Sequence, residues 1–587
     1  MLASVLSYNL DLWKRLGGGN LPQAGSEPGA EQTYFQQDGG PSAPASNRGV
    51  GFELTLQKEQ AFDFLRKFNQ GRINRRQLLH SLSLIGAFGA IGSVAPGLLV
   101  GPARAQGTPK RGGTLVAATI DKPVNMDPAF AELYSSMQVY QNVFSKLVNA
   151  QRDGTLLPGL AKSWSQVSDT AWDFVLVDNA WFHNDEKFTA ADVKYTFDRL
   201  KDPNVGAANA VFVEALEGVE VIDDTTARFH TKPNWGGLLL ALAGIGDIVN
   251  QKAIEANDPR QVPIGTGPYK FVEWVKDDHI TLERWDKYFK PDQPYLDRII
   301  FRAIADDTQR LNGLQTGEFD WIEAVPLHRV EELKQNPELK ANLSGQFFPD
   351  IMLLNTTKPP FDNLAVRQAL QWAMPRDTIA KVVWHGQAVP SSEPVSPSNV
   401  WYSGEDFYPA APDLGKARSL LQSAGIENLD IAFAAQPQVA TQPLVGQLMQ
   451  QQLRQIGINL DVQSFESARW FEELATKRYD ITSTYWSVSL DPIGHALAPL
   501  THSKSAWNFT GFDDSPELDA AIEAANFTVD PEARKQAYAK LVRLHQELSP
   551  MIFMVNMDRT YWTRPNVHGV ETLPSLEVRM ENVWIDA

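Results

Sequence analysis

Cysteine is absent from this sequence of 587 residues. Its absence excludes disulfide bonds, thiolate metal sites, iron–sulfur clusters, cysteine nucleophiles and a lipid-modified N-terminal cysteine. Basic residues are also few, since 53 Lys and Arg stand against 70 Asp and Glu, a net charge of −17. Because phosphate binding needs a basic face, this deficit argues against a nucleic-acid partner. Hydrophobic residues make up 43% and charged residues 21%, close to globular averages, so wholesale disorder is excluded as well.

The N-terminal part of the chain has the pattern of an export signal. Residues 1–70 lack a sustained apolar period and predict a disordered extension, or, for residues 1–50, a misassigned start. Arg75 and Arg76 then precede a glycine-punctuated apolar stretch at 82–100, which a small-x-small pattern closes at 103–105. This order predicts a twin-arginine signal peptide over residues 71–105, cleaved near Ala105. The alternative is a membrane anchor, which the glycines of the apolar stretch disfavour.

The predicted secondary structure of the remaining chain changes its character twice, which is called a change of texture below. Short strand-like runs predominate up to about residue 360, including a helix predicted to begin after Thr189 with Asp192 in its first turn. Longer helices alternate with strands from there to about 557, and short β-like pieces return at the end. Two changes of texture predict two α/β lobes joined by two chain crossings, the architecture of a hinged clamp.

Motifs for catalysis, phosphate binding and metal binding are missing. The sequence contains no Gly-x-Ser-x-Gly elbow, His-Glu-x-x-His, phosphate loop or EF-hand pattern. The glycines at 265–268 are interpreted as a tight turn, and His495 and His502 as solvated or structural residues rather than metal ligands. Paired carboxylates are interpreted as solvated faces: Asp223 and Asp224, Asp277 and Asp278, Asp306 and Asp307. We therefore expect no catalytic residues, no metal site and no cofactor, and predict that the chain is not an enzyme.

Several segments, taken in order, resemble a known family. They are residues 111–115 and 126–128, 157–164, 181–193, 265–269, 355–361 with 366–370, 485–492 and 531–550. Together they resemble the solute-binding proteins of ABC importers in the oligopeptide, dipeptide and nickel class, solute-binding family five. The resemblance extends over essentially all of residues 108–587.

The resemblance implies a fold and its boundaries. We expect an α/β, two-lobed periplasmic binding protein of class II-like (cluster C) type, with an extra subdomain in lobe one. The base of lobe one would comprise residues 108–140, 264–360 and 560–587. The extra subdomain would comprise 141–263 and lobe two 361–559, with the ligand lying between the lobes.

The resemblance also implies a ligand site. Peptide binders of the family hold the ligand backbone as an added β-strand, and residues 482–487 match the strand that does so. The predicted ligand-binding residues are Glu132, Tyr134, Tyr485, Trp486, Ser487, Ser489 and Asp491. Two alternatives remain open, because Trp486 could be an ordinary core residue, and Glu132 and Tyr134 could lie on an ordinary helix.

One departure from the family pattern affects the choice of solute. Peptide-binding members have an aspartate three residues after the tryptophan, where it pairs with the terminal amine of the peptide, and here that position is Ser489. If the ligand is a peptide, Asp491 or Glu132 would have to pair with this amine, because an unpaired buried ammonium is costly. The solute, whether a peptide, an opine, a sugar or another small molecule, therefore stays open.

These observations predict a periplasmic solute receptor. It would capture a peptide or another small solute and deliver it to ABC permease subunits with their cytoplasmic ATPase, and we expect it to be a monomer. The alternatives are a sensory solute receptor and an extracellular hydrolase.

Overall fold

The computed structural model describes residues 108–586 except 131–133, 152–153, 405–406, 438, 489 and 574–577. The predicted extension (1–70) and the predicted signal peptide (71–105) lie outside the described residues, as do Glu132 and Ser489. Within the described part, no helix combines the length and the apolar character needed to cross a membrane.

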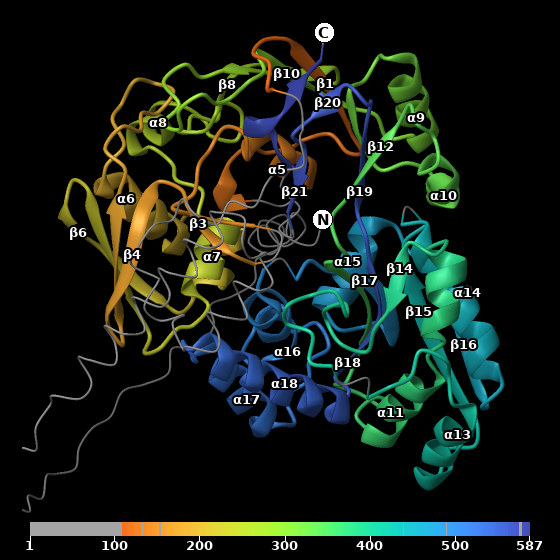
Figure 1. The fold of residues 1–587 in the computed structure, drawn as a ribbon. Helices are drawn as coiled ribbons and strands as arrows, with labels where there is room; N and C mark the ends of the chain where they lie inside the picture. Colours follow the sequence, from red (N-terminus) through yellow and green to blue (C-terminus); the bar gives the residue numbers. More distant parts are fainter. Residues whose placement is uncertain are drawn as a thin grey trace, which may run out of the picture. The chain divides into compact units, whose positions relative to one another are not determined.

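The first lobe is built on a seven-stranded sheet (Figure 1). Its strands, in spatial order, are β12 (Lys340–Leu343), β19 (Thr560–Thr563), β11 (Trp321–Glu323), β1 (Thr114–Thr119), β10 (Arg298–Ala303), β9 (His279–Arg284) and β8 (Tyr269–Val275). Strand β1 pairs in parallel with β10 and β11, and the other pairs are antiparallel.

Both faces of this sheet are covered, and β1 shows why. Leu115 and Ala117 lie in one core cluster, with residues of and after α5 (Tyr134–Tyr140). Ala118 lies in another cluster, with α9 (Asp307–Thr316) and α10 (Val330–Leu333). This is the period of two that a strand imposes, because successive side chains point to opposite faces.

The second lobe is built on a six-stranded sheet. Its strands, in spatial order, are β14 (Ala388–Pro390), β18 (Met551–Met557), β13 (Phe348–Leu354), β17 (Ile481–Tyr485), β15 (Leu429–Ala435) and β16 (Ile458–Ser464). Every residue of β13 and β18 is buried. Near-continuous apolar strands of this kind occur where both faces of a sheet are covered.

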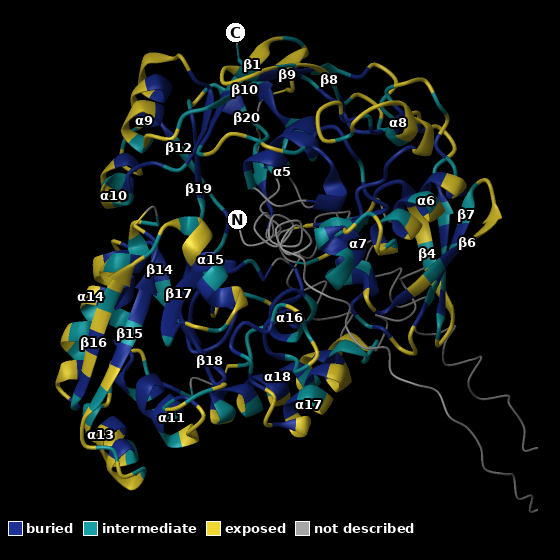
Figure 2. Ribbon diagram, turned by 180° about the vertical axis from the view of Figure 1, so that it is seen from behind, coloured by how far each residue is buried: buried dark blue, intermediate teal, exposed yellow. Residues whose placement is uncertain are grey.

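Helices pack on each face of the six-stranded sheet. Met352 and Leu354 of β13 contact α11 (Leu364–Ala373), α13 (Leu414–Ser423) and α14 (Thr441–Arg454). Ile351 and Leu353 of the same strand share a core with α15 (Ser467–Ala475), α17 (Pro516–Asn526) and α18 (Pro531–Leu548). The outer sides of these helices carry the exposed residues (Figure 2).

The extra subdomain has a four-stranded antiparallel sheet. Its strands, in spatial order, are β4 (Ala161–Ser168), β5 (Ala171–Leu176), β7 (Thr226–Thr231) and β6 (Leu216–Asp223). Helices α6 (Ala190–Lys201) and α7 (Leu238–Ile245) contribute to its core. The predicted start of α6 is confirmed, since Thr189 is its N-cap and the Asp192 carboxylate accepts the Thr189 N–H at 3.0 Å.

The chain crosses between the two large sheets from β12 to β13 and again from β18 to β19. The second crossing is the short segment between Met557 of β18 and Thr560 of β19. Strand β13 belongs to the six-stranded sheet although its residues were expected in lobe one, which was to continue to residue 360. The change of texture at Pro359 and Pro360 marks the end of strand-rich sequence after β13, not the crossing before it.

Candidate functional site

The two crossing segments are hydrogen-bonded to each other. The Ser344 N–H donates to the Arg559 carbonyl at 3.0 Å, and the Arg559 N–H donates to the Ser344 hydroxyl at 2.9 Å. The Asp558 carboxylate accepts the N–H groups of Gly345 at 2.5 Å and Gln346 at 3.0 Å. Gly345 has a φ of 102°, a value that favours glycine. These bonds hold the two crossings side by side, at the only two places in the described chain where it passes between the large sheets.

The Arg559 guanidinium lies among three aromatic rings at this point. Its central carbon is 4.5 Å from the ring centroid of Tyr134, 5.1 Å from Phe348 and 5.8 Å from Tyr485. Tyr134 begins α5 in the first lobe, whereas Phe348 and Tyr485 belong to β13 and β17 of the second. The structure therefore brings the predicted residues Tyr134 and Tyr485 together on one cation, a contact that favours arginine.

Arg559 also forms a buried ion pair with Glu323 of β11. Its Nη1 donates to Glu323 Oε1 at 2.9 Å, where the side chain of Glu323 is 2% exposed and that of Arg559 is 19% exposed. Burial raises the pKa of the Glu323 carboxyl, and the charge of Arg559 opposes this rise. We name the group of Tyr134, Glu323, Phe348, Tyr485 and Arg559 the crossing cluster.

The segment after β17 continues the pairing with the strand β13. The N–H of Trp486 donates to the Pro349 carbonyl at 2.9 Å, and that of Val488 to the Phe347 carbonyl at 3.3 Å. Because the backbone groups of successive residues point in opposite directions, those of Tyr485 and Ser487 face away from β13. On that side the pairing of β17 with β15 reaches only Thr482.

Trp486 lies in a hydrophobic core cluster of the second lobe, in keeping with the alternative that it is an ordinary core residue. It is 9% exposed, and its indole N–H donates to the His495 carbonyl at 2.6 Å. Its ring meets that of Trp507 edge to face, with centroids 5.4 Å apart. These contacts fix the start of the loop that leads to Asp491.

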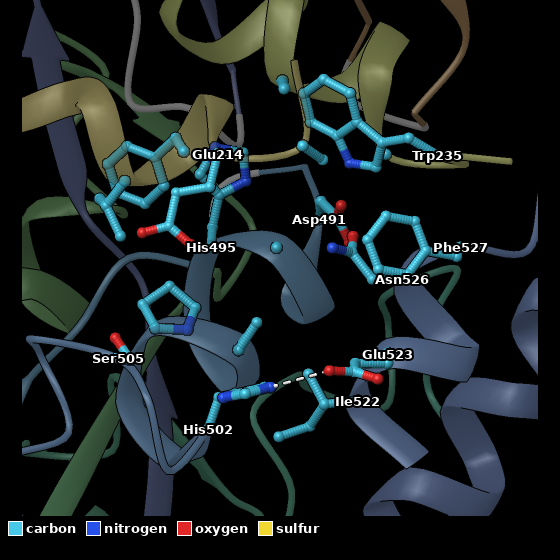
Figure 3. Close-up of a pocket in the computed structure, with 18 of the residues that line it drawn as sticks. Glu214, Trp235, Asp491, His495, His502, Ser505, Ile522, Glu523, Asn526 and Phe527 are labelled. Carbon is cyan, nitrogen blue, oxygen red and sulfur yellow. Dashed lines mark hydrogen bonds and ion pairs between the residues drawn. The ribbon is translucent and has the colours of Figure 1, made fainter. Parts of the chain in front are cut away.

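Asp491 has a cationic partner of its own. Its carboxylate is 2.8 Å from Nη2 of Arg534, and both side chains are 3% exposed. The N–H of Ile493 donates to the same carboxylate at 3.1 Å, and Arg534 also donates to the Ala525 carbonyl. Asp491 lines a cavity beside this pair (Figure 3). The guanidinium of Arg534 thus occupies the position beside Asp491 that the sequence interpretation gave to the amine of a ligand.

Sequence reasoning did not identify Arg559, Glu323 or Arg534. Arg559 comes two residues after the end of the buried strand β18, so a charged residue close behind a buried apolar run was the available signal. Nothing in the local sequence pairs Glu323 with Arg559 or Asp491 with Arg534, because both pairs join distant parts of the chain. Among the described residues, no cluster of three or more histidine, aspartate or glutamate side chains is placed to hold a metal ion.

Two lobes connected by two adjacent crossings, with an extra subdomain on the first, define a two-lobed periplasmic binding protein, and the predicted fold class is confirmed. The chain belongs to the bacterial extracellular solute-binding proteins, family 5, whose "Middle" model matches residues 155–508. This confirms the family that the sequence resembled.

Three known proteins illustrate the family. The glutathione-binding protein GsiB of Pectobacterium atrosepticum is 29% identical over 427 residues, 70% of this chain and 83% of that protein. The structure of the ABC transporter-associated periplasmic binding protein DppA from Helicobacter pylori, in complex with the peptide STSA, matches with a TM-score of 0.72 and 23% identity. That of AgaA from A. tumefaciens, in complex with agropinic acid, matches with a TM-score of 0.71 and 24% identity. Each of these two alignments covers 81% of this chain and 99% of the other.

Proposed function

We propose that this protein is the periplasmic solute-binding component of an ABC importer, which captures a small carboxylate-bearing solute between its lobes and delivers it to the permease subunits. Its family consists of extracellular solute-binding proteins. The protein would act by closing its two lobes around the solute and not by making or breaking bonds. A ligand that contacts both lobes selects the conformation in which both contacts exist.

The observation that carries this proposal is the crossing cluster. Tyr134 from the first lobe and Tyr485 from the second meet on Arg559, which itself belongs to the segment joining the lobes. A solute bound there would touch both lobes and the hinge at once. Excluding water from such a site strengthens its hydrogen bonds and aromatic contacts.

The charges favour recognition of a carboxylate over recognition of an amine. Among the described residues, the Arg559 guanidinium donates one hydrogen bond, to Glu323, whereas a guanidinium carries five N–H donors. Asp491, the predicted partner of a ligand amine, is neutralised by Arg534. We therefore assign Arg559 to a carboxylate of the solute. Glutathione, peptides and agropinic acid, for which the relatives are named, all carry carboxylates.

The other predicted residues keep their proposed roles around this anchor. The backbone of Tyr485 would pair with an extended solute, and Glu132, Ser487 and Ser489 stay among the predicted ligand-binding residues. Trp486 would act by holding this edge in place, because its indole is bound to His495 inside the second lobe.

We further propose that residues 71–105 direct export by the twin-arginine route. Replacing Arg75 and Arg76 together by lysine should keep the precursor inside the cell, because the pathway reads the arginine pair itself. Fractionation with an antibody would show this. Normal appearance of the double variant in the periplasm would contradict the proposed route while leaving the binding function untouched.

The proposed function is tested by the solute itself. The protein is purified from its native secretion, the bound small molecule is released by denaturation and identified by mass spectrometry, and its affinity is measured by calorimetry. We expect a carboxylate-bearing solute whose amidated or esterified form binds about 10- to 100-fold more weakly, since a hydrogen bond to a charged group contributes about 1.5–3 kcal/mol. A solute without a carboxylate, or equal affinity of both forms, would contradict the anchor at Arg559. Absence of any bound or bindable solute would contradict the function as a whole.

A further inference from the structure

The cavity beside Asp491 lies between the extra subdomain and the second lobe, apart from the crossing cluster (Figure 3). Its volume is about 270 Å³. A water molecule takes about 30 Å³ of liquid volume, so the space accommodates a group much larger than a single water. The subdomain contributes residues from η2 (Ala208–Val213) and α7, and the second lobe from η5 (Ile493–Leu497), α16 (Ala498–Thr501) and α17.

Two polar atoms in the wall of this cavity have no hydrogen-bond partner among the described residues. They are Nδ1 of His495 and Oδ1 of Asn526, and both atoms are buried. His495 as a whole is 6% exposed. More than nine in ten buried polar groups in proteins are hydrogen-bonded, and leaving one unpaired is costly. Both residues line the cavity, so a rotation of either side chain would present an unpartnered polar atom to an occupant.

The imidazole of His495 packs against a ring of the extra subdomain. The ring of Phe212, from the subdomain, lies 5.0 Å from it between centroids, and the His495 carbonyl accepts the Trp486 indole N–H at 2.6 Å. Trp486 in turn lies between Tyr485 and Ser487, the residues of the predicted ligand edge. The cavity is therefore connected to that edge through one side chain.

The charges in the wall are largely compensated. Asp491 is paired with Arg534, and the carboxylate of Glu523 lies 3.4 Å from the ring of His502, which compensates that charge only when the ring is protonated. Burial lowers the pKa of His495, so its ring is neutral at pH 7. The remaining charged residues are one acid, Glu214, and two bases, Lys232 and Lys504, all of them exposed or part-exposed at the rim.

The charges in the wall of the cavity indicate which kind of chemical group can bind there. A buried ammonium or carboxylate needs an opposite charge that is not already engaged, and moving it there without one is very costly. An uncharged amide or hydroxyl needs only hydrogen-bond partners, which His495 and Asn526 supply. We propose that this cavity is a specificity pocket for an uncharged polar group of the solute, an amide or a hydroxyl, hydrogen-bonded by His495 and Asn526. The inference rests on the proposed solute-binding function.

The test begins with a probe that does not depend on the identity of the solute. Propionamide, n-butylammonium and butyrate are each titrated into the full mature protein, while the imidazole nitrogens of ¹⁵N-labelled histidine are followed by NMR. We expect a saturable shift of the His495 signal with propionamide only. Asn526→Leu should weaken propionamide binding about tenfold through the lost hydrogen bond, and Lys232→Gln, at the rim, should leave it unchanged.

Asn526→Asp sharpens the test because it changes the charge and nearly keeps the shape. It should transfer the preference of the pocket from propionamide to n-butylammonium. Absence of a saturable shift with propionamide would mean a cavity that holds water only, and equal binding of all three probes would mean one without selectivity. Either result would overturn the inference.

The link to the solute is tested separately with the molecule that co-purifies with the protein. Asn526→Leu should weaken its binding about tenfold. If propionamide binds but the affinity for the solute is unchanged, the pocket is not part of the solute site, and the inference fails while the proposed function stands. If propionamide binds and no solute is ever found, the proposed function fails and the pocket remains a site for a polar group alone.

Discussion

Two buried arginine–carboxylate pairs in this protein have the same chemistry and different surroundings. Arg534 and Asp491 both belong to the second lobe, and each side chain is 3% exposed. Arg559 and Glu323 connect the second crossing to β11 of the first lobe, and the side chain of Arg559 is 19% exposed. The first pair is buried where the second lobe meets Gly237 of the extra subdomain, whereas the second lies at the crossings and keeps access to solvent.

The difference separates a structural role from a binding role. Arg534 is held by Asp491, by the Ala525 carbonyl and by the ring of Trp401, 5.1 Å away, all in its own lobe. Arg559 is held by rings from both lobes. A buried charge pair contributes little net stability but is destabilising when one partner is removed. One partner of each pair can therefore be replaced while the other stays. We expect lower stability when the Arg534–Asp491 pair is broken and weaker solute binding when Arg559 is changed.

The largest expected effect is that of Arg534→Met on stability. It leaves the Asp491 carboxylate buried without a partner, which costs about 3–5 kcal/mol. Thermal unfolding should show a clearly lower Tm, and the double variant Asp491→Asn with Arg534→Met should regain part of the loss. A single variant as stable as the wild type would show that Asp491 is not the enclosed partner that the structure indicates.

The second effect is that of Arg559→Lys on solute affinity. Lysine keeps the charge but loses the planar fork and the ring contacts, so binding should weaken about 10- to 100-fold, which corresponds to about 1.4–2.8 kcal/mol. Calorimetry with the co-purified solute measures this. Arg228→Lys is the matched control, because it alters an arginine–carboxylate pair with Asp173 in the sheet of the extra subdomain and should leave the affinity unchanged. Asp491→Asn is measured beside it, because an amine-anchored ligand would need that carboxylate. The reverse result, a loss of affinity with Asp491→Asn and none with Arg559→Lys, would favour a peptide ligand whose amine pairs with Asp491.

A third buried carboxylate, Asp350 of β13, has an indole in place of an arginine. It accepts the Trp384 N–H at 3.1 Å, and burial raises its pKa to about 7. Its pKa in the folded state is above that in the unfolded state, so its contribution to stability is complete below about pH 4 and is lost as the pH rises to about 7.

Stability should accordingly fall by roughly 2 kcal/mol between pH 5 and pH 8 through this group. Asp350→Asn removes the titration, so the difference in Tm between wild type and variant should shift in favour of the variant as the pH rises. A pH-independent difference would show that Asp350 is ionised in the folded protein at pH 5.

The sequence predicts the class of fold well and the site only in part. Thr189 and Asp192 identify a helix start from residues three positions apart, and Tyr134 and Tyr485 meet at the crossing cluster. The resemblance could indicate both tyrosines because Tyr485 lies in a segment that matches the family and Tyr134 closely follows one. A helix cap such as that at Thr189 can be predicted from the sequence because neighbouring residues largely determine it.

Other features depend on contacts that no local pattern contains. The strand β13 has the same apolar texture in either sheet, so its place in the second lobe is decided by pairing with β17 and β18. The partners of Asp491 and Arg559 are likewise decided by tertiary structure. The unpaired atoms of His495 and Asn526 become visible only when the subdomain and the second lobe are seen together.

Small-angle X-ray scattering of the mature protein, with and without its co-purified solute, tests the central claim most directly. Closure of two lobes around a solute predicts a smaller radius of gyration at saturation, and Arg559→Lys should need a correspondingly higher solute concentration for the same change. Identical scattering curves for the free and the saturated protein would contradict the account, because a solute that binds without drawing the lobes together is not captured by the mechanism proposed here.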